Sequence, residues 1–148
     1  MDLFAVFDIS SAGMSVEQTR LAVAAANLAN ARTSRTAEGT PYQPLAVAVQ
    51  STSAAHGSYA DVAASLRADM LPRPIVQSVA PTQAAPRLVY DPGHPDADAS
   101  GFVSLPAVDT LSTMLDLVAV SRGYEANLRA FDLTRSLIER TLDMGNRR

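Results

Sequence analysis

The 148-residue sequence contains no cysteine, no tryptophan and no lysine, so all 12 of its basic residues are arginine. The absence of cysteine excludes disulfide-stabilised scaffolds, cysteine nucleophiles, zinc ribbons and thiolate-bound iron–sulfur clusters. Only 5% of the residues are aromatic, and the longest purely apolar run, residues 21–26, is six residues long. Since a membrane-spanning helix needs about 20 apolar residues, no membrane span is predicted.

The net charge and the alanine content further limit the kinds of protein that this sequence can encode. The net charge is −3 and the pI is near 5.2, whereas a general nucleic-acid binder needs a basic face, so no nucleic-acid partner is expected. Hydrophobic residues make up 47% of the chain, but 26 residues are alanine, which buries little area and favours helix. The composition therefore favours thin, extended helical packing. Residues 1–4 lack the basic region of a cleavable secretory signal, so export would leave the N-terminus in place.

The distribution of proline divides the chain into three segments. All nine prolines lie within residues 32–107, which we predict to be a Pro/Gly-rich β module with a flexible loop or insertion at 51–68. Residues 1–31 and 108–148 are predicted to be long helices that form a coiled-coil core. The expected fold is mainly α, with the two terminal helices paired as an antiparallel coiled coil and an irregular β-hairpin insert between them.

Apolar residues recur every seven positions in both predicted helices, which keeps them on one narrow stripe. The N-terminal stripe comprises Phe7, Met14, Leu21 and Leu28, and the C-terminal stripe comprises Leu117, Tyr124, Phe131 and Ile138. A second C-terminal row at coiled-coil offsets comprises Met114, Ser121, Leu128, Arg135 and Leu142. Each stripe is diluted by alanine, so an isolated helical hairpin would be weakly stable. The pattern indicates a subunit that is stabilised by neighbouring subunits.

Polar residues beside these stripes also have predicted roles. Asn27 and Asn30 stand near the end of the first helix, where they could donate to free carbonyls, bridge to the neighbouring helix or simply stop the helix. Tyr124 would bury its ring while its hydroxyl reaches a polar neighbour, with Glu125 and Asn127 beside it. Two helix-surface ion pairs are expected, Glu125–Arg129 and Asp132–Arg135.

The middle segment contains three predicted extended stretches, at residues 42–50, 72–79 and 87–90. The residues after the third stretch include His94, Asp96 and Asp98, which are possible metal ligands. Turns are expected here because prolines and a glycine interrupt the segment, and Asp side chains in turns usually accept from local backbone donors. No phosphate-binding loop, no nucleophile elbow and no carboxylate pair with an obvious basic partner occur. We therefore expect no metal, no cofactor and no enzymatic activity.

Three motifs occur in order along the chain. They are Ala-Asn-Leu-Ala-Asn-Ala at 26–31, Tyr-Asp-Pro-Gly-His-Pro-Asp-Ala-Asp at 90–98 and Ser-Arg-Gly-Tyr-Glu-Ala-Asn at 121–127. The outer two resemble the Ser-Asn-Leu-Ala-Asn-Ala and Ser-Arg-Ala-Tyr-Glu-Ala-Asn elements of bacterial flagellar axial proteins, the family of rod, hook and filament subunits. The middle motif resembles a segment characteristic of proximal rod subunits and contributes Tyr90, Asp91, Pro92, Gly93, His94, Pro95, Asp96 and Asp98. Gly123 stands where the family usually has alanine.

The resemblance implies a function as a structural subunit of the proximal rod of the flagellar basal body, which crosses the periplasm. Such subunits assemble helically, transmit motor torque to the hook and are needed for motility. The implied partners are copies of the chain, other proximal and distal rod proteins, the export-gate adaptor subunit and the type III export apparatus, which exports these subunits without a cleaved signal. The two stripes, Asn27, Asn30, Glu125, Asn127 and Leu128 are the candidate assembly residues.

Two other classes remain open at this point. A non-flagellar coiled-coil adaptor would fit the two helices but would leave the motif at 90–98 unexplained. A metal-dependent enzyme could be built on the histidine and aspartates of that motif.

Overall fold

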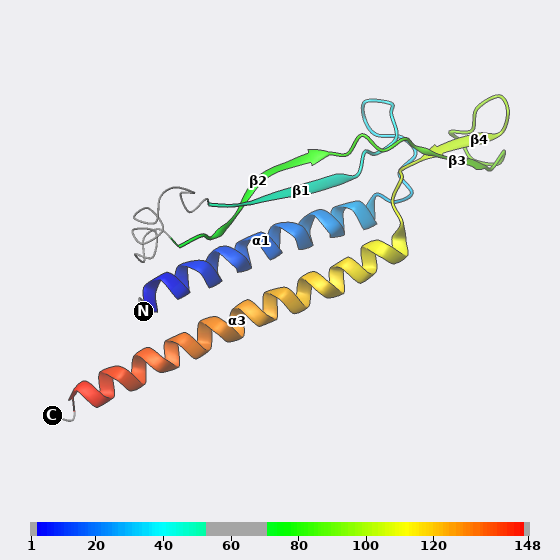
Figure 1. The fold of residues 1–148 in the computed structure, drawn as a ribbon. Coiled ribbons are helices and arrows are strands. Elements are labelled where there is room, and N and C mark those ends of the chain that lie inside the picture. The colour runs from blue at the N-terminus through cyan, green and yellow to red at the C-terminus, as the bar shows by residue number, and fades with distance from the viewer. Residues whose placement is uncertain (1–2, 53–70, 147–148) are drawn as a thin grey trace. The chain divides into compact units, whose positions relative to one another are not determined.

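The computed structural model describes residues 3–52 and 71–146, and its architecture is mainly helical with two small β-sheets (Figure 1). The elements in chain order are helix α1 (Leu3–Ala29), strands β1 (Leu45–Ser51), β2 (Pro74–Pro81), β3 (Arg87–Tyr90) and β4 (Phe102–Leu105), and helix α3 (Thr110–Asn146). Two long terminal helices flanking a β region were predicted, and both are confirmed. The predicted loop at 51–68 falls almost wholly outside the described residues.

The ends of both helices are set by local polar groups. Asp109 caps the N-terminus of α3, because its Oδ1 accepts a hydrogen bond from the backbone N–H of Leu111 at 3.0 Å. At the end of α1, the backbone N–H and side-chain Nδ2 of Asn30 both donate to the carbonyl of Ala26, at 3.0 and 2.9 Å. These bonds satisfy groups that a helix end otherwise leaves unpaired.

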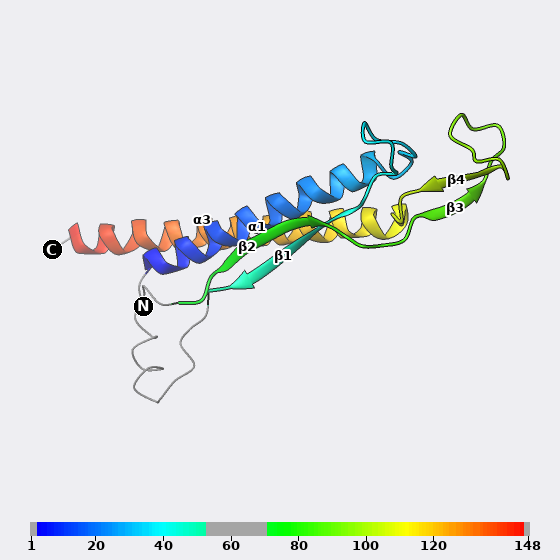
Figure 2. The same cartoon turned by 90° about the horizontal axis from the view of Figure 1, so that it is seen from above.

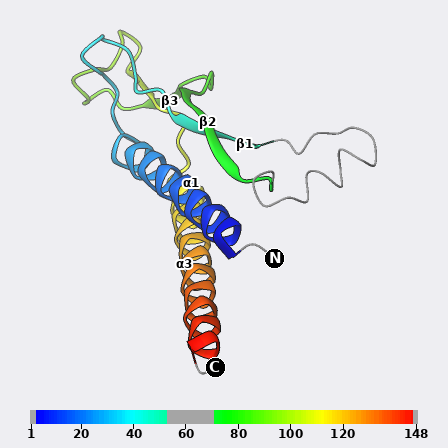
Figure 3. The same cartoon turned by 90° about the vertical axis from the view of Figure 1, so that its left-hand side faces the viewer.

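The chain divides into two compact units, the first built from described parts of residues 1–19, 49–77 and 120–148. In this unit α1 contacts α3 (Figure 3): the rings of Phe7 and Phe131 meet edge to face with centroids 4.5 Å apart. Further along α1, Gly13 lies against Asn127 of α3. Since the residue numbers rise along one helix as they fall along the other, the helices are antiparallel, as predicted.

The second unit comprises residues 20–48 and 78–119 and contains the β3–β4 hairpin. The two strands pair antiparallel, with Arg87 opposite Leu105 and Tyr90 opposite Phe102. Val103 is only 2% exposed and anchors one face of this hairpin. The sequence predicted β3 with its observed bounds, but the short β4 was missed.

Strands β1 and β2 form the other sheet, and Figure 2 shows them running side by side in opposite directions. Bonds near its two ends confirm the antiparallel pairing: the N–H of Thr52 donates to the carbonyl of Arg73 at 2.9 Å, and that of Thr82 to the carbonyl of Pro44 at 2.7 Å. Leu45, the first residue of β1, begins an alternation of half-buried and exposed residues, which is the predicted strand pattern.

Large side chains contribute little to the core. Among the described residues, the buried apolar side chains are Ala5, Val16 and Val103, together with Pro44 and the fully buried Pro106. None of the described helices is apolar enough over a sufficient length to span a membrane. The small core agrees with the predicted thin helical packing.

Candidate assembly site and its motif contacts

The motif at residues 26–31 joins the end of α1 to the start of β1 through Asn27. The side-chain amide of Asn27 pairs with the backbone of Leu45 as a neighbouring strand would: Nδ2 donates to the Leu45 carbonyl at 2.8 Å, and Oδ1 accepts from the Leu45 N–H at 2.8 Å. The same Oδ1 accepts from the hydroxyl of Tyr42 at 2.9 Å. Burial raises the pKa of Tyr42, because desolvation disfavours the phenolate.

The two asparagines of this motif therefore have different roles. The Asn30 side chain donates to the Ala26 carbonyl, which also accepts from the Asn30 backbone N–H, and its Oδ1 accepts from the Thr33 hydroxyl at 3.2 Å. Asn27 bridges to a neighbouring element, which is a strand and not a helix. The sequence carried no signal for this pairing, because its partner lies 18 residues away.

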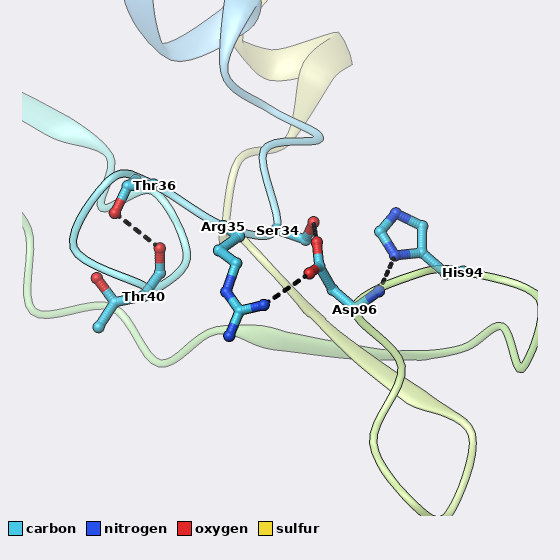
Figure 4. A network of polar contacts seen from close by, with 6 residues as sticks. All are labelled: Ser34, Arg35, Thr36, Thr40, His94 and Asp96. Atoms are coloured by element: carbon cyan, nitrogen blue, oxygen red, sulfur yellow. Dashed lines mark hydrogen bonds and ion pairs between the residues drawn. The ribbon is translucent and has the colours of Figure 1, made fainter.

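The motif at residues 90–98 forms the loop of the β3–β4 hairpin, and Asp96 ties this loop to the chain after α1 (Figure 4). The Asp96 carboxylate accepts from the hydroxyl of Ser34 at 2.7 Å and from Nη1 of Arg35 at 3.3 Å. Its backbone N–H donates to Nδ1 of His94 at 3.1 Å. The Arg35 side chain is 66% exposed, so solvent weakens its ion pair with Asp96. The ion pair therefore stabilises the loop less than the hydrogen bond from the Ser34 hydroxyl does.

The third candidate metal ligand, Asp98, also forms hydrogen bonds within the loop. Its Oδ1 accepts from the backbone N–H groups of Ser100 and Phe102, at 2.8 and 2.9 Å, as expected of an aspartate in a turn. Within residues 3–52 and 71–146, no group of three or more His, Asp or Glu side chains is placed to hold a metal ion. The side chains of this motif organise the hairpin loop.

The motif at residues 121–127 contributes to a close contact between α1 and α3. A Cβ atom added to Gly13 would lie 2.9 Å from Oδ1 and 3.0 Å from Nδ2 of Asn127, so no side chain fits there without displacing this amide. The amide is held by a bond from Nδ2 to the carbonyl of Gly123 at 3.1 Å. At Gly123, a Cβ would lie 3.3 Å from Cδ of Glu17, a looser contact with a flexible side chain.

The predicted C-terminal stripe faces inwards, whereas the second row does not. Leu117, Tyr124, Phe131 and Ile138 are all half-buried. In the second row, by contrast, Met114 is 48%, Leu128 41% and Leu142 64% exposed. The better-covered row beside the stripe is Thr113, Val120, Asn127 and Thr134.

The N-terminal stripe shows a similar division between covered and exposed side chains. Phe7, Met14 and Leu28 are half-buried, but Leu21 is 42% exposed.

On α3, the predicted Glu125–Arg129 ion pair is present at 3.7 Å. The predicted partner of Arg135 was wrong, because Arg135 pairs with Glu139 at 3.0 Å.

Comparison with known proteins decides between a flagellar rod subunit, a non-flagellar coiled-coil adaptor and a metal-dependent enzyme. The chain is 35% identical over 145 residues to the flagellar basal-body rod protein FlgC of Salmonella typhimurium (strain LT2), a match that covers 98% of this chain and 99% of that protein. This chain belongs to the FlgC family of flagellar basal-body rod proteins. No family model matches the chain.

Other members of the FlgC family are similar over the same length. The Aquifex aeolicus protein is 32% identical over 145 residues, covering 97% of each chain. The Bacillus subtilis (strain 168) protein is 32% identical over 149 residues, covering 98% of this chain and 99% of its own. Membership confirms a structural subunit of the basal-body rod and the expectation that the chain is not an enzyme.

Proposed function

We propose that this chain forms part of the proximal rod, where it assembles helically with copies of itself and with other rod proteins to carry motor torque to the hook. The terminal segments 1–31 and 108–148 form the assembly core in this proposal, and residues 32–107 form an accessory module. Export through the flagellar type III apparatus and contact with the export-gate adaptor belong to the same proposal, which is supported by the three family motifs.

The observation that carries the proposal is the exposure of large apolar side chains on α3. Leu111, Leu115 and Leu133 are 68%, 63% and 62% exposed, and Met144 is 67% exposed. Exposed apolar patches of this kind mark interaction surfaces. A helical subunit with few buried large side chains gains most of its stability from packing against neighbours.

The candidate assembly residues fall into two groups in this proposal. Exposed Leu21 and Leu128 are available to neighbouring subunits. The half-buried stripe residues and Asn127 hold α1 against α3, and Asn27 holds α1 against β1. These internal contacts give the subunit the rigidity that a torque-transmitting rod requires.

The decisive experiment deletes the gene for this chain and complements the deletion with the wild-type gene. We expect the deletion strain to lack complete rods, hooks and motility, the complemented strain to regain them, and the chain to be detected in purified basal bodies. Motile deletion cells with complete hooks and filaments would overturn the proposal, provided that genome inspection and a double deletion rule out a substituting paralogue.

A further inference from the structure

The β3–β4 hairpin is joined to the rest of the chain by two short irregular connectors. Residues 82–86 precede β3 and residues 106–109 follow β4, and neither connector contains a helix or a strand. Connecting segments of this kind are the more mobile parts of a protein. The hairpin therefore needs further contacts to keep one direction relative to the end of α1, which lies in the same compact unit.

Asp96 supplies the polar contact that fixes this direction (Figure 4). Its carboxylate accepts from the Ser34 hydroxyl at 2.7 Å and from Nη1 of Arg35 at 3.3 Å. Among the described residues, no other member of the hairpin, residues 87–105, has a hydrogen bond or ion pair to a residue outside it. Hydrogen bonds are directional whereas apolar burial is not, so the burial of Val103 does not by itself fix the direction of the hairpin.

The linker that carries Ser34, residues 30–44, is itself bonded to the end of α1. The Thr33 hydroxyl donates to Oδ1 of Asn30 at 3.2 Å, and the Thr33 carbonyl accepts from the backbone N–H of Tyr42 at 3.2 Å. The Tyr42 hydroxyl donates to Oδ1 of Asn27 at 2.9 Å. Asp96 therefore joins the hairpin to a segment that is already held on the helix.

The paired strands of the hairpin do not depend on the Asp96 carboxylate. Four residue pairs connect β3 to β4, and the rings of Tyr90 and Phe102 meet edge to face with centroids 5.3 Å apart. The turn is closed by Asp98, whose Oδ1 accepts from two backbone N–H groups. Loss of the Asp96 carboxylate should therefore loosen the loop and free the hairpin to change direction while β3 and β4 stay paired.

We infer that Asp96 is a positioning residue for assembly, which holds the hairpin in the one direction relative to α1 that the rod accepts. A helical assembly repeats the same contacts at every subunit, so a hairpin that points in several directions disturbs each of them. The inference rests on the proposed function and adds to it a residue that acts through Ser34 and Arg35.

Exchanging the two partners tests this role in cells. Asp96→Ser removes the carboxylate and Ser34→Asp places two carboxylates together, so each alone should lower incorporation into purified basal bodies about tenfold. The double variant restores one hydroxyl and one carboxylate and should recover most of the loss. A double variant as defective as the single variants would overturn the inference, because a side chain that contacts a neighbouring subunit directly is not rescued by the exchange.

The direction of the hairpin is measured in the purified full-length chain. The chain has no cysteine, so spin labels can be attached through Ala29→Cys at the end of α1 and Ser100→Cys in the hairpin loop, both exposed positions. We expect a narrow distribution of distances between the labels in the otherwise wild-type chain, a broad one with Asp96→Ser, and a narrow one again in the exchanged double variant. An equally narrow distribution with Asp96→Ser would overturn the inference.

Asp91→Ser is the matched control, because Asp91 is exposed in the same loop and its carboxylate has no hydrogen bond or ion pair to any described residue. It should leave the distances between the labels unchanged. Circular dichroism checks that every variant retains wild-type helix content. A wild-type chain absent from basal bodies contradicts the proposed function itself, whereas an incorporated wild-type chain whose exchanged variant does not recover overturns only the role of Asp96.

Discussion

Replacing Gly13 with alanine should destabilise the α1–α3 pair, although the same change stabilises most helices. In an open helix, Gly→Ala gains about 1 kcal/mol from backbone entropy. Here the added Cβ would lie 2.9 Å from Oδ1 of Asn127, so the amide must move and give up its 3.1 Å bond to the carbonyl of Gly123. Overpacking costs about 1–3 kcal/mol and the lost bond about 1 kcal/mol, which together exceed the gain.

The expected net effect is a loss of about 1–3 kcal/mol, which for a chain of this size lowers the Tm by about 2–12 °C. The measurement is thermal unfolding of the purified chain, followed by circular dichroism at 222 nm. Gly123→Ala is the matched control: its Cβ meets only the flexible Glu17 side chain at 3.3 Å, so it should raise the Tm by about 2–4 °C.

A double-mutant cycle tests the cause of this difference. In an Asn127→Ala background the amide is gone, so Gly13→Ala should become neutral or stabilising, and the two substitutions should couple by more than about 1 kcal/mol. If Gly13→Ala raises the Tm in the wild-type background, or if the two substitutions prove additive, the packing of this amide against Gly13 does not limit the approach of the helices.

Three further predictions concern the second unit. Asn27→Ala should cost about 1–2 kcal/mol and speed amide exchange at Leu45, measured by hydrogen exchange, because two backbone groups lose their partner; unchanged exchange would contradict the pairing. Asp96→Ala should speed amide hydrogen exchange in residues 91–101 while leaving helix content unchanged, because only the hairpin loop loses its hydrogen bonds to Ser34 and Arg35. Exchange as slow as in the wild type would show that these bonds do not hold the loop in place. Burial raises the pKa of Tyr42, so the stability linked to its protonated form is complete below pH ~10 and is lost as the pH rises through the raised pKa. In an absorbance titration at 295 nm, the component removed by Tyr42→Phe should have its midpoint above pH ~10.

The sequence alone was enough to predict much of the fold, and the reasons are local. Proline is confined to residues 32–107, which leaves both ends free to form long helices, and seven-residue spacing placed Leu117, Tyr124 and Phe131 on one face. The bounds of β3 were also predicted, whereas the four-residue β4 carried too short a pattern to be recognised. The motifs at 26–31, 90–98 and 121–127 indicated the family before any geometry was known.

The contacts that give these motifs their roles depended on the tertiary structure. A heptad stripe has neighbouring rows at coiled-coil offsets on both sides, so periodicity alone does not show which row completes the seam. The row with larger side chains, which includes Met114 and Leu128, is exposed in the structure. The helices approach closely at Gly13, where smaller residues such as Asn127 fit, and the large side chains of the other row remain exposed.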